Sequence, residues 1–138
     1  MTPKRWVLDT SAAVPLLMDS HPAHQTVAAW AAGRTLGLSG HALLETYSVL
    51  TRLPGDARVT SADAVTLING RFTASVTLSA AAASAAHEVL SESGVYGGAS
   101  WDGLVALAAR EHDVTLVTRD VRALATYNAL GITTGILA

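Results

Sequence analysis

The sequence predicts an α/β protein in which a central parallel sheet lies between two layers of helices. Short apolar strands alternate with helical segments along the chain, which is typical of parallel sheets covered on both faces. The length of 138 residues, half of them hydrophobic, is enough to bury one core. No linker or internal repeat interrupts the pattern, so we expect a single domain over residues 1–138.

The first half of the chain is predicted to contain two strands and four helices. Pro22 suits the first turn of one helix, and Asp63 suits the positive first turn of another. Ser39-Gly40 and Pro54-Gly55 are stop signals for the segments before them. The expected elements are strand 6–8, helix 11–18, helix 22–32, strand 35–38, helix 41–53 and a helix from residue 61.

The second half continues the alternation with shorter connections. An alanine-rich stretch favours a tightly packed helix over disorder. The expected elements are strand 76–78, helix 79–91, loop 94–98, helix 99–112, strand 114–117, helix 121–130 and strand 132–136.

Charged residues are scarce in this sequence. They make up 14% of the chain, against about a quarter in ordinary domains, so apolar side chains must remain exposed or be covered by another chain. Oligomerisation and a simple richness in alanine explain this equally well. The net charge of −2 does not indicate a nucleic-acid-binding protein, so any role with RNA must be argued from a site.

The absence of cysteine excludes disulfides and thiolate metal sites, and it is compatible with a cytoplasmic protein. An apolar stretch follows Lys4 and Arg5, but Asp9 interrupts it too early for a secretory signal. No run approaches the roughly 18 apolar residues of a membrane span. We therefore expect a cytoplasmic protein that does not cross a membrane.

Four of the eleven acidic residues stand in unusual settings: Asp9, Glu45, Asp102 and Asp120. Asp9 and Asp120 follow predicted strands, and open parallel sheets bind ligands at the carboxyl ends of their strands. Glu45 and Asp102 lie on predicted helices beside apolar neighbours, where an unpaired charge is costly. Glu45 has no obvious basic partner within four residues.

Four carboxylates in one crevice would repel each other unless a cation neutralised them. Oxygen-only ligands favour Mg²⁺ or Mn²⁺. Structural roles remain possible for three of the residues taken singly. Asp9 and Asp120 could cap the following helices, and Asp102 could occupy the first turn of its own helix. The four together favour a metal site.

The segments around these residues resemble the PIN domain of small bacterial toxin ribonucleases of the VapC type. The similar segments are VLDTSA around Asp9, HALLETY around Glu45, WDGLVALAA around Asp102, and LVTRD ending at Asp120, followed by RALATY. They come in the family's order and span nearly the whole chain. Trp101 and Gly103 depart from the commoner residues of the family without removing a ligand.

The resemblance implies a sheet of strand order 3-2-1-4-5, which places the first and fourth strands side by side and brings Asp9 close to Asp120. It implies an RNA-cleaving endonuclease dependent on Mg²⁺ or Mn²⁺, with Asp9, Asp102 and Asp120 as metal ligands and Glu45 completing the catalytic set. Ser11 and Thr118 are candidate residues for orienting these ligands, with ordinary strand-end hydroxyls as the equal alternative.

Expected partners follow from the same resemblance. They are an RNA substrate (tRNA, rRNA or mRNA), a VapB-like antitoxin and a second copy of the chain in a homodimer. A non-catalytic PIN-like scaffold is the main alternative, although a scaffold would be expected to lose acidic positions and none of the four is missing. A receiver-type phosphoacceptor fits poorly, because it needs a late lysine and Lys4 is the single lysine.

Overall fold

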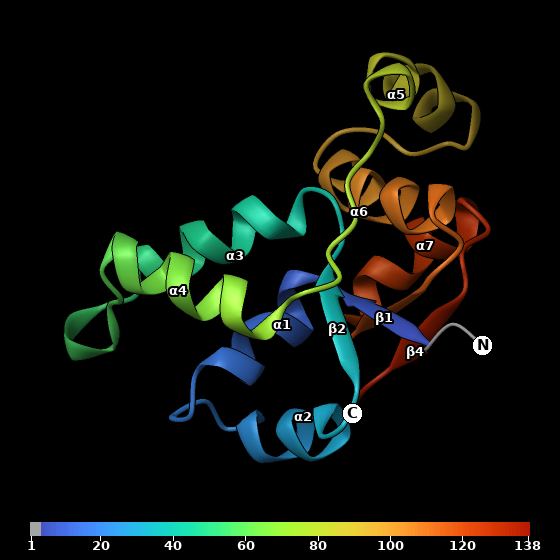
Figure 1. Cartoon of the computed structure of the whole chain (residues 1–138). Helices are drawn as coiled ribbons and strands as arrows, with labels where there is room; N and C mark the ends of the chain where they lie inside the picture. Colours follow the sequence, from blue (N-terminus) through green and yellow to red (C-terminus); the bar gives the residue numbers. More distant parts are fainter. Residues whose placement is uncertain (1–3) are drawn as a thin grey trace.

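A twisted parallel sheet forms the centre of the molecule (Figure 1). The computed structural model describes residues 4–138. Within that range the sheet has four strands in the order β2-β1-β3-β4. Their bounds are Arg5–Leu8 for β1, Thr35–Leu38 for β2, Thr115–Thr118 for β3 and Thr134–Ile136 for β4. All three pairings are parallel, as the alternation of strands and helices predicts.

Helices cover both faces of this sheet. Alternate side chains of a strand point to opposite faces, so Val7 and Leu116 pack with α5, α6 and α7, whereas Leu8 and Val117 pack with α1 to α4. The predicted three-layer α/β class is thereby confirmed. The helices are α1 Thr10–Leu17, α2 His24–Ala31, α3 Ala42–Thr51, α4 Ser61–Arg71, α5 Ala80–Glu92, α6 Ala99–Glu111 and α7 Leu124–Ala129.

The strand predicted at residues 76–78 is wrong in its bounds and its extent. Within the described residues, this part of the chain forms an isolated bridge between Ser39 and Val76, beside β2. The backbone amides of Ala74 and Val76 donate to the carbonyls of Leu36 and Leu38. The segment therefore occupies the edge that the expected order 3-2-1-4-5 gives to its third strand, but it lies two residues earlier and does not form a regular ladder.

Gly37 and Ser75 explain why the ladder is interrupted. The amide of Leu38 donates to the Ser75 hydroxyl at 2.9 Å, where a regular parallel strand would offer a backbone carbonyl. The carbonyl of Ala74 instead passes over Gly37, so closely that a Cβ built on Gly37 would lie 2.1 Å from the Ala74 oxygen. The lack of a side chain at Gly37 thus permits the close approach of this edge segment.

Several helix bounds also differ from the prediction. Pro22 lies outside its helix, because α2 begins at His24. The helix expected over 121–130 begins as a 3₁₀ turn at Val121–Ala123 before α7. Such turns are common at helix starts. Across residues 4–138, every helix is too short or too polar to cross a bilayer.

Candidate active site

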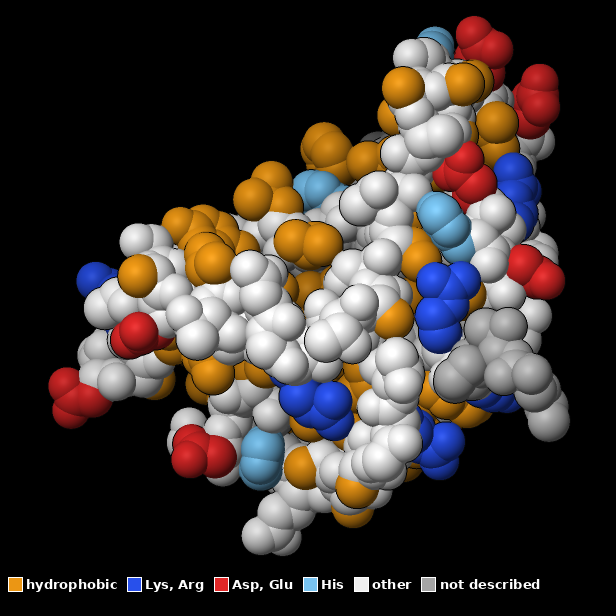
Figure 2. Space-filling model, in the orientation of Figure 1, with side chains coloured by type: hydrophobic (Ala, Val, Ile, Leu, Met, Phe, Trp, Pro, Cys, Tyr) orange, Lys and Arg blue, Asp and Glu red, His pale blue; other side chains and the backbone are white. Residues whose placement is uncertain are grey.

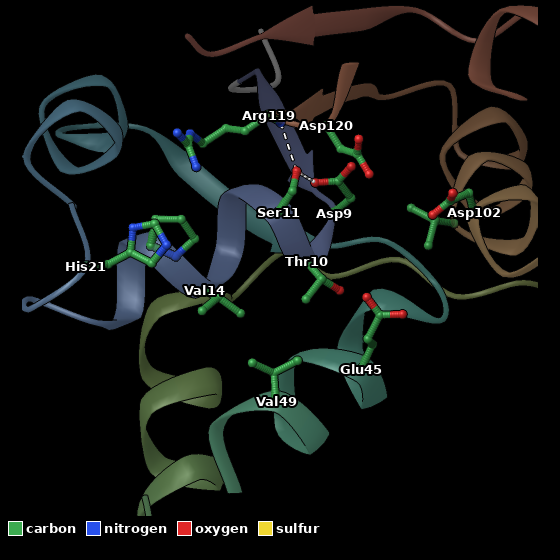
Figure 3. A pocket seen from close by; sticks show the side chains of 12 residues that line it. Asp9, Thr10, Ser11, Val14, His21, Glu45, Val49, Asp102, Arg119 and Asp120 are labelled. Atoms are coloured by element: carbon green, nitrogen blue, oxygen red, sulfur yellow. Dashed lines mark hydrogen bonds between the residues drawn. The ribbon is translucent and has the colours of Figure 1, made fainter. Parts of the chain in front are cut away.

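The four predicted carboxylates line one cavity of about 400 Å³ at the carboxyl end of the sheet (Figure 3). Asp9 follows β1, and Asp120 comes two residues after the end of β3, the neighbouring strand. Glu45 reaches the cavity from the first turn of α3 and Asp102 from the first turn of α6. The parallel register thus brings together side chains that are far apart in the sequence.

Asp9 is the most enclosed of the four, with 5% of its surface exposed. It is the N-cap of α1, because its Oδ1 accepts a hydrogen bond from the Ala12 amide at 3.3 Å. The same oxygen accepts from the Ser11 hydroxyl at 2.6 Å. Burial raises the pKa of Asp9, and these hydrogen bonds act in the opposite direction. Capping and a place in the site are therefore compatible for this residue.

Tyr127 is a site residue that the sequence analysis did not single out. Its side chain is fully buried, and its hydroxyl donates to Oδ2 of Asp9 at 2.8 Å. Burial, and then the charge of Asp9, raise the pKa of Tyr127, so the hydroxyl stays protonated and remains a donor. RALATY, the segment that ends in Tyr127, belongs to the resemblance, but nothing local in it indicates a contact with a residue 118 positions away.

Ser11 and Thr118 join the two strand ends through their hydroxyls. Since the single Ser11 proton goes to Asp9, Thr118 is the donor in the 3.2 Å contact between the two hydroxyl groups. Thr118 Oγ1 accepts from the Asp120 amide at 3.0 Å, and Ser11 Oγ accepts from the Arg119 amide at 2.8 Å. Both hydroxyls thus hold the loop that carries Asp120 against Asp9.

Asp102 experiences the charges of all three other carboxylates. Burial is the largest cause of its raised pKa, followed by repulsion from Asp120, Asp9 and Glu45, while His41 acts in the opposite direction. Asp120 is more open: it caps the following 3₁₀ turn through the Arg122 amide at 3.0 Å. The Arg122 side chain, which is almost fully exposed, lies 3.7 Å from Asp120.

Glu45 does have a basic neighbour, contrary to the sequence analysis. His41 lies one helical turn earlier, with its Nε2 3.8 Å from Glu45 Oε2, an ion pair only when His41 is protonated. The His41 ring also stacks on Trp101, with centroids 5.0 Å apart, and Trp101 is 56% exposed. The stacked His41 and Trp101 rings therefore join the start of α3 to the first turn of α6, next to Glu45 and Asp102.

The donor chemistry of this site fits a hard divalent cation. Carboxylate and hydroxyl oxygens are the ligands that Mg²⁺ and Mn²⁺ prefer, and crowded carboxylates lose their mutual repulsion when such an ion binds. Over residues 4–138, however, no three acidic or histidine side chains already have the geometry to hold one ion. The fit rests on the donor set and its electrostatics, and binding would draw the side chains together.

A parallel sheet of this order, with four carboxylates gathered where β1 and β3 end, defines a PIN-domain protein. The chain belongs to the PIN domain family, which matches residues 6–129. Among its relatives is ribonuclease VapC27 of Mycobacterium tuberculosis (strain ATCC 25618 / H37Rv), which is 50% identical over 125 residues, 91% of each chain.

Solved structures show the same fold. VapBC2 from Rickettsia felis, bound to a DNA fragment from its promoter, superposes with a TM-score of 0.66 at 16% identity, covering 97% of this chain and 99% of that one. Mycobacterium tuberculosis VapC20, described as a sarcin-ricin loop cleaving toxin, has a TM-score of 0.66 at 20% identity, covering 94% and 97%. The resemblance drawn from the sequence is confirmed at the level of the family and the fold.

Proposed function

We propose that this chain is an endoribonuclease that depends on Mg²⁺ or Mn²⁺ and hydrolyses RNA phosphodiester bonds. One observation carries the proposal: Asp9, Glu45, Asp102 and Asp120 line a single cavity, and repulsion from the other three contributes to the raised pKa of Asp102. A fold that concentrates negative charge at this cost is suited to binding a cation.

Asp9, Asp102 and Asp120 would hold the metal ion, and Glu45 would complete the acidic shell. When bound, the ion lowers the pKa of a water molecule and stabilises charge that develops on the phosphate. The chain's own part is to fix the ligands. Tyr127 and Ser11 hold one carboxylate, that of Asp9, by its two oxygens.

RNA as the substrate is supported by the relatives. VapC27 bears the name ribonuclease, and VapC20 is described as a sarcin-ricin loop cleaving toxin. The substrate could equally be tRNA, rRNA or mRNA, because the cavity itself shows only suitability for phosphodiester chemistry. Binding in an acidic cavity is possible once the metal ion has neutralised the carboxylates.

We further propose that the chain is the toxin of a VapBC-type pair and forms a homodimer in the absence of its antitoxin. The antitoxin partner is supported by the likeness to VapBC2, which is a toxin–antitoxin complex. Figure 2 shows hydrophobic side chains gathered over α3 and α4, where Leu44, Val65 and Leu67 are exposed by 63%, 48% and 39%. Such a surface is suited to burial against another chain.

The acidic cavity suggests how an antitoxin would inhibit this toxin. An arginine from the partner could pair with two carboxylates at once and so replace the charge of the metal ion. Inhibition of this kind would protect the cell until the antitoxin is removed.

The nuclease proposal is tested by incubating the purified chain with total cellular RNA in Mg²⁺, in Mn²⁺ and in EDTA. Cleavage is expected with either metal and not with EDTA. Absence of cleavage in both metals would favour the alternative, a PIN-like scaffold that binds a partner without catalysis.

The toxin and dimer proposals need separate measurements. Expression of the wild-type chain in a bacterial host should arrest growth, while expression of Asp9→Asn should not. Equal growth in both would contradict the toxin role and leave the fold unaffected. Light scattering should give twice the monomer mass at micromolar concentration, and a strictly monomeric protein would contradict the homodimer.

A further inference from the structure

We propose that Arg119 and His21 form a phosphate-binding subsite in the catalytic cavity, which holds an RNA backbone phosphate next to the one that is cleaved. The inference rests on the proposed nuclease function, because it assigns part of the substrate to that same cavity. It extends the site from the acidic residues to a basic end that attracts the substrate's charge.

The two basic side chains lie away from the acidic ones in the cavity. Both line the same 400 Å³ space as the four carboxylates. In Figure 3, Arg119 and His21 lie on the side opposite Asp102, with Ser11 between the Arg119 guanidinium and Asp9. The two basic side chains thus lie at a different end of the cavity from the cluster of carboxylates (Figure 3).

The Arg119 side chain lacks the partners that an arginine normally has inside a protein. Its Nε is buried and has no hydrogen-bond partner among residues 4–138. Within the same residues, the ion pairs involve other side chains, so no carboxylate neutralises Arg119. Protein atoms cover Nε, so a phosphate in the cavity would contact the terminal nitrogens of the guanidinium and supply the opposite charge that Arg119 lacks.

The local backbone holds Arg119 in place for this role. Its amide donates to Ser11 Oγ at 2.8 Å, and Ser11 is itself fixed by its hydrogen bond to Asp9. The backbone of Arg119 is therefore anchored to the same hydroxyl that orients the proposed metal ligand. The root of the arginine side chain is thus held next to the proposed metal site.

His21 is set up as a hydrogen-bond donor even when it is neutral. The Ala23 amide donates to His21 Nδ1 at 3.0 Å, so Nδ1 carries a lone pair and the ring proton resides on Nε2. That N–H can donate to a phosphate oxygen. Val14 and Val49 contribute an apolar wall to the cavity, against which the sugar of the same nucleotide can pack.

Such a subsite answers a difficulty that the composition raises. The chain has a net charge of −2, and its catalytic cavity contains four carboxylates, so electrostatic attraction for RNA cannot come from bulk charge. One guanidinium placed inside the cavity gives a local phosphate contact that positions the strand.

The test compares Arg119→Gln with Arg52→Gln, each made in an Asp102→Asn background so that RNA is not consumed. Arg52 is exposed at the end of α3 and outside the cavity, and its replacement removes the same charge. The affinity for a fluorescein-labelled single-stranded RNA is measured by anisotropy, in Mg²⁺, over a range of salt concentrations. Thermal melting of each variant checks that it is folded.

Arg119→Gln should weaken RNA binding about tenfold. The slope of log K, the logarithm of the association constant, against the logarithm of the salt concentration should become shallower by about 0.7, which is the value for one phosphate contact with a single strand. Arg119→Lys should keep most of the salt dependence, because the charge remains. His21→Ala should weaken binding while His87→Ala, which changes an exposed histidine outside this cavity, should not. Inorganic phosphate should compete only weakly, because it lacks the neighbouring nucleotide contacts.

Two results would overturn the subsite. If the RNA affinity of Arg119→Gln equals that of the parent, Arg119 does not bind RNA and would instead bind another ligand, such as an acidic segment of a protein partner. If Arg119→Gln and Arg52→Gln lose the same amount of RNA affinity, the loss is explained by the change in net charge and not by a subsite. If the wild-type chain cleaves no RNA but Arg119→Gln still lowers the salt dependence of binding, then the nuclease proposal fails, and Arg119 remains a contact for an RNA phosphate without a role in cleavage.

Discussion

The hydroxyl of Tyr127 donates a 2.8 Å hydrogen bond to Oδ2 of Asp9, joining a core aromatic residue of α7 to the carboxylate that directly follows β1. Asp9 Oδ1 is held at the same time by Ser11 and the Ala12 amide. Both oxygens of the carboxylate are thus fixed from the protein side. The core of the domain is coupled directly to the geometry of the site.

Replacing Tyr127 with Phe should keep the ring packing but leave Asp9 Oδ2 without its donor. We expect a loss of about 1–3 kcal/mol in the free energy of unfolding and a fall of about 10–100-fold in the cleavage rate. Urea unfolding and initial rates measure the two effects.

Tyr47→Phe is the matched control, because no hydrogen bond of the Tyr47 hydroxyl is seen within residues 4–138. If the two variants show the same free energy of unfolding and the same cleavage rate, the Tyr127–Asp9 hydrogen bond has no role in stability or catalysis.

Asp102→Asn should stabilise the fold at neutral pH in EDTA. The pKa of Asp102 lies above its ordinary value of 3.8, because burial and then the neighbouring carboxylates disfavour the charged form. Because the folded state favours the protonated form, the contribution of Asp102 to the free energy of unfolding is fully present below pH 3.8. This contribution is lost as the pH rises through the pKa of Asp102 in the folded state. The melting temperature of Asp102→Asn should exceed that of the wild type at neutral pH, and the gain should vanish below pH 3.8. A lower melting temperature at neutral pH would mean that repulsion at Asp102 is not significant.

Gly37→Ala should destabilise the protein, because its Cβ would lie 2.1 Å from the Ala74 oxygen and force the edge segment away from β2. A loss of about 1–3 kcal/mol or more is expected from such overpacking. Gly70→Ala is the matched control, since Gly70 is exposed within α4 and an added Cβ would have no atom within 4 Å. That change should stabilise the helix by about 0.5–1 kcal/mol. Chemical denaturation measures both, and a tolerated Gly37→Ala would refute the close approach.

Mg²⁺ should raise the melting temperature of the wild-type chain, because it binds the folded carboxylate cluster and relieves its repulsion. Asp9→Asn should respond less. Glu92→Gln removes an exposed carboxylate at the end of α5, so its response should equal that of the wild type. An unchanged melting temperature of the wild type in saturating Mg²⁺ would argue against the metal site.

The sequence predicts most of the fold because the strand and helix patterns are local. Asp9 and Asp120 could be identified because each follows a strand, and in a parallel sheet strand ends meet at one edge. The edge segment beside β2 was misplaced because its pairing depends on Gly37 and Ser75, which lie 38 positions apart and bring a side-chain hydroxyl into the ladder. No periodicity within 76–78 carries that information.

Two features of the site were beyond local reasoning. Tyr127 contacts Asp9 only because α7 packs against the sheet, so its apolar surroundings predict burial and not a hydrogen bond. From the sequence alone, Arg119 can be interpreted equally as a contact for a phosphate beside the site or as a solvated helix-end arginine, and its unpartnered Nε becomes visible only in the folded structure. His41, in contrast, could have been recognised four residues before Glu45 from helical spacing alone.

The central claim is that the acidic cavity is the catalytic centre, and the cleavage rate of Asp102→Asn tests it most directly. Initial rates on a labelled RNA in Mg²⁺ are compared for the wild type, Asp102→Asn and the exposed-site control Glu92→Gln. We predict that Asp102→Asn folds normally but loses about two orders of magnitude or more in rate, because it lacks an anionic metal ligand, while Glu92→Gln retains full activity. Wild-type rates in Asp102→Asn would contradict the assignment of this cavity as the active site.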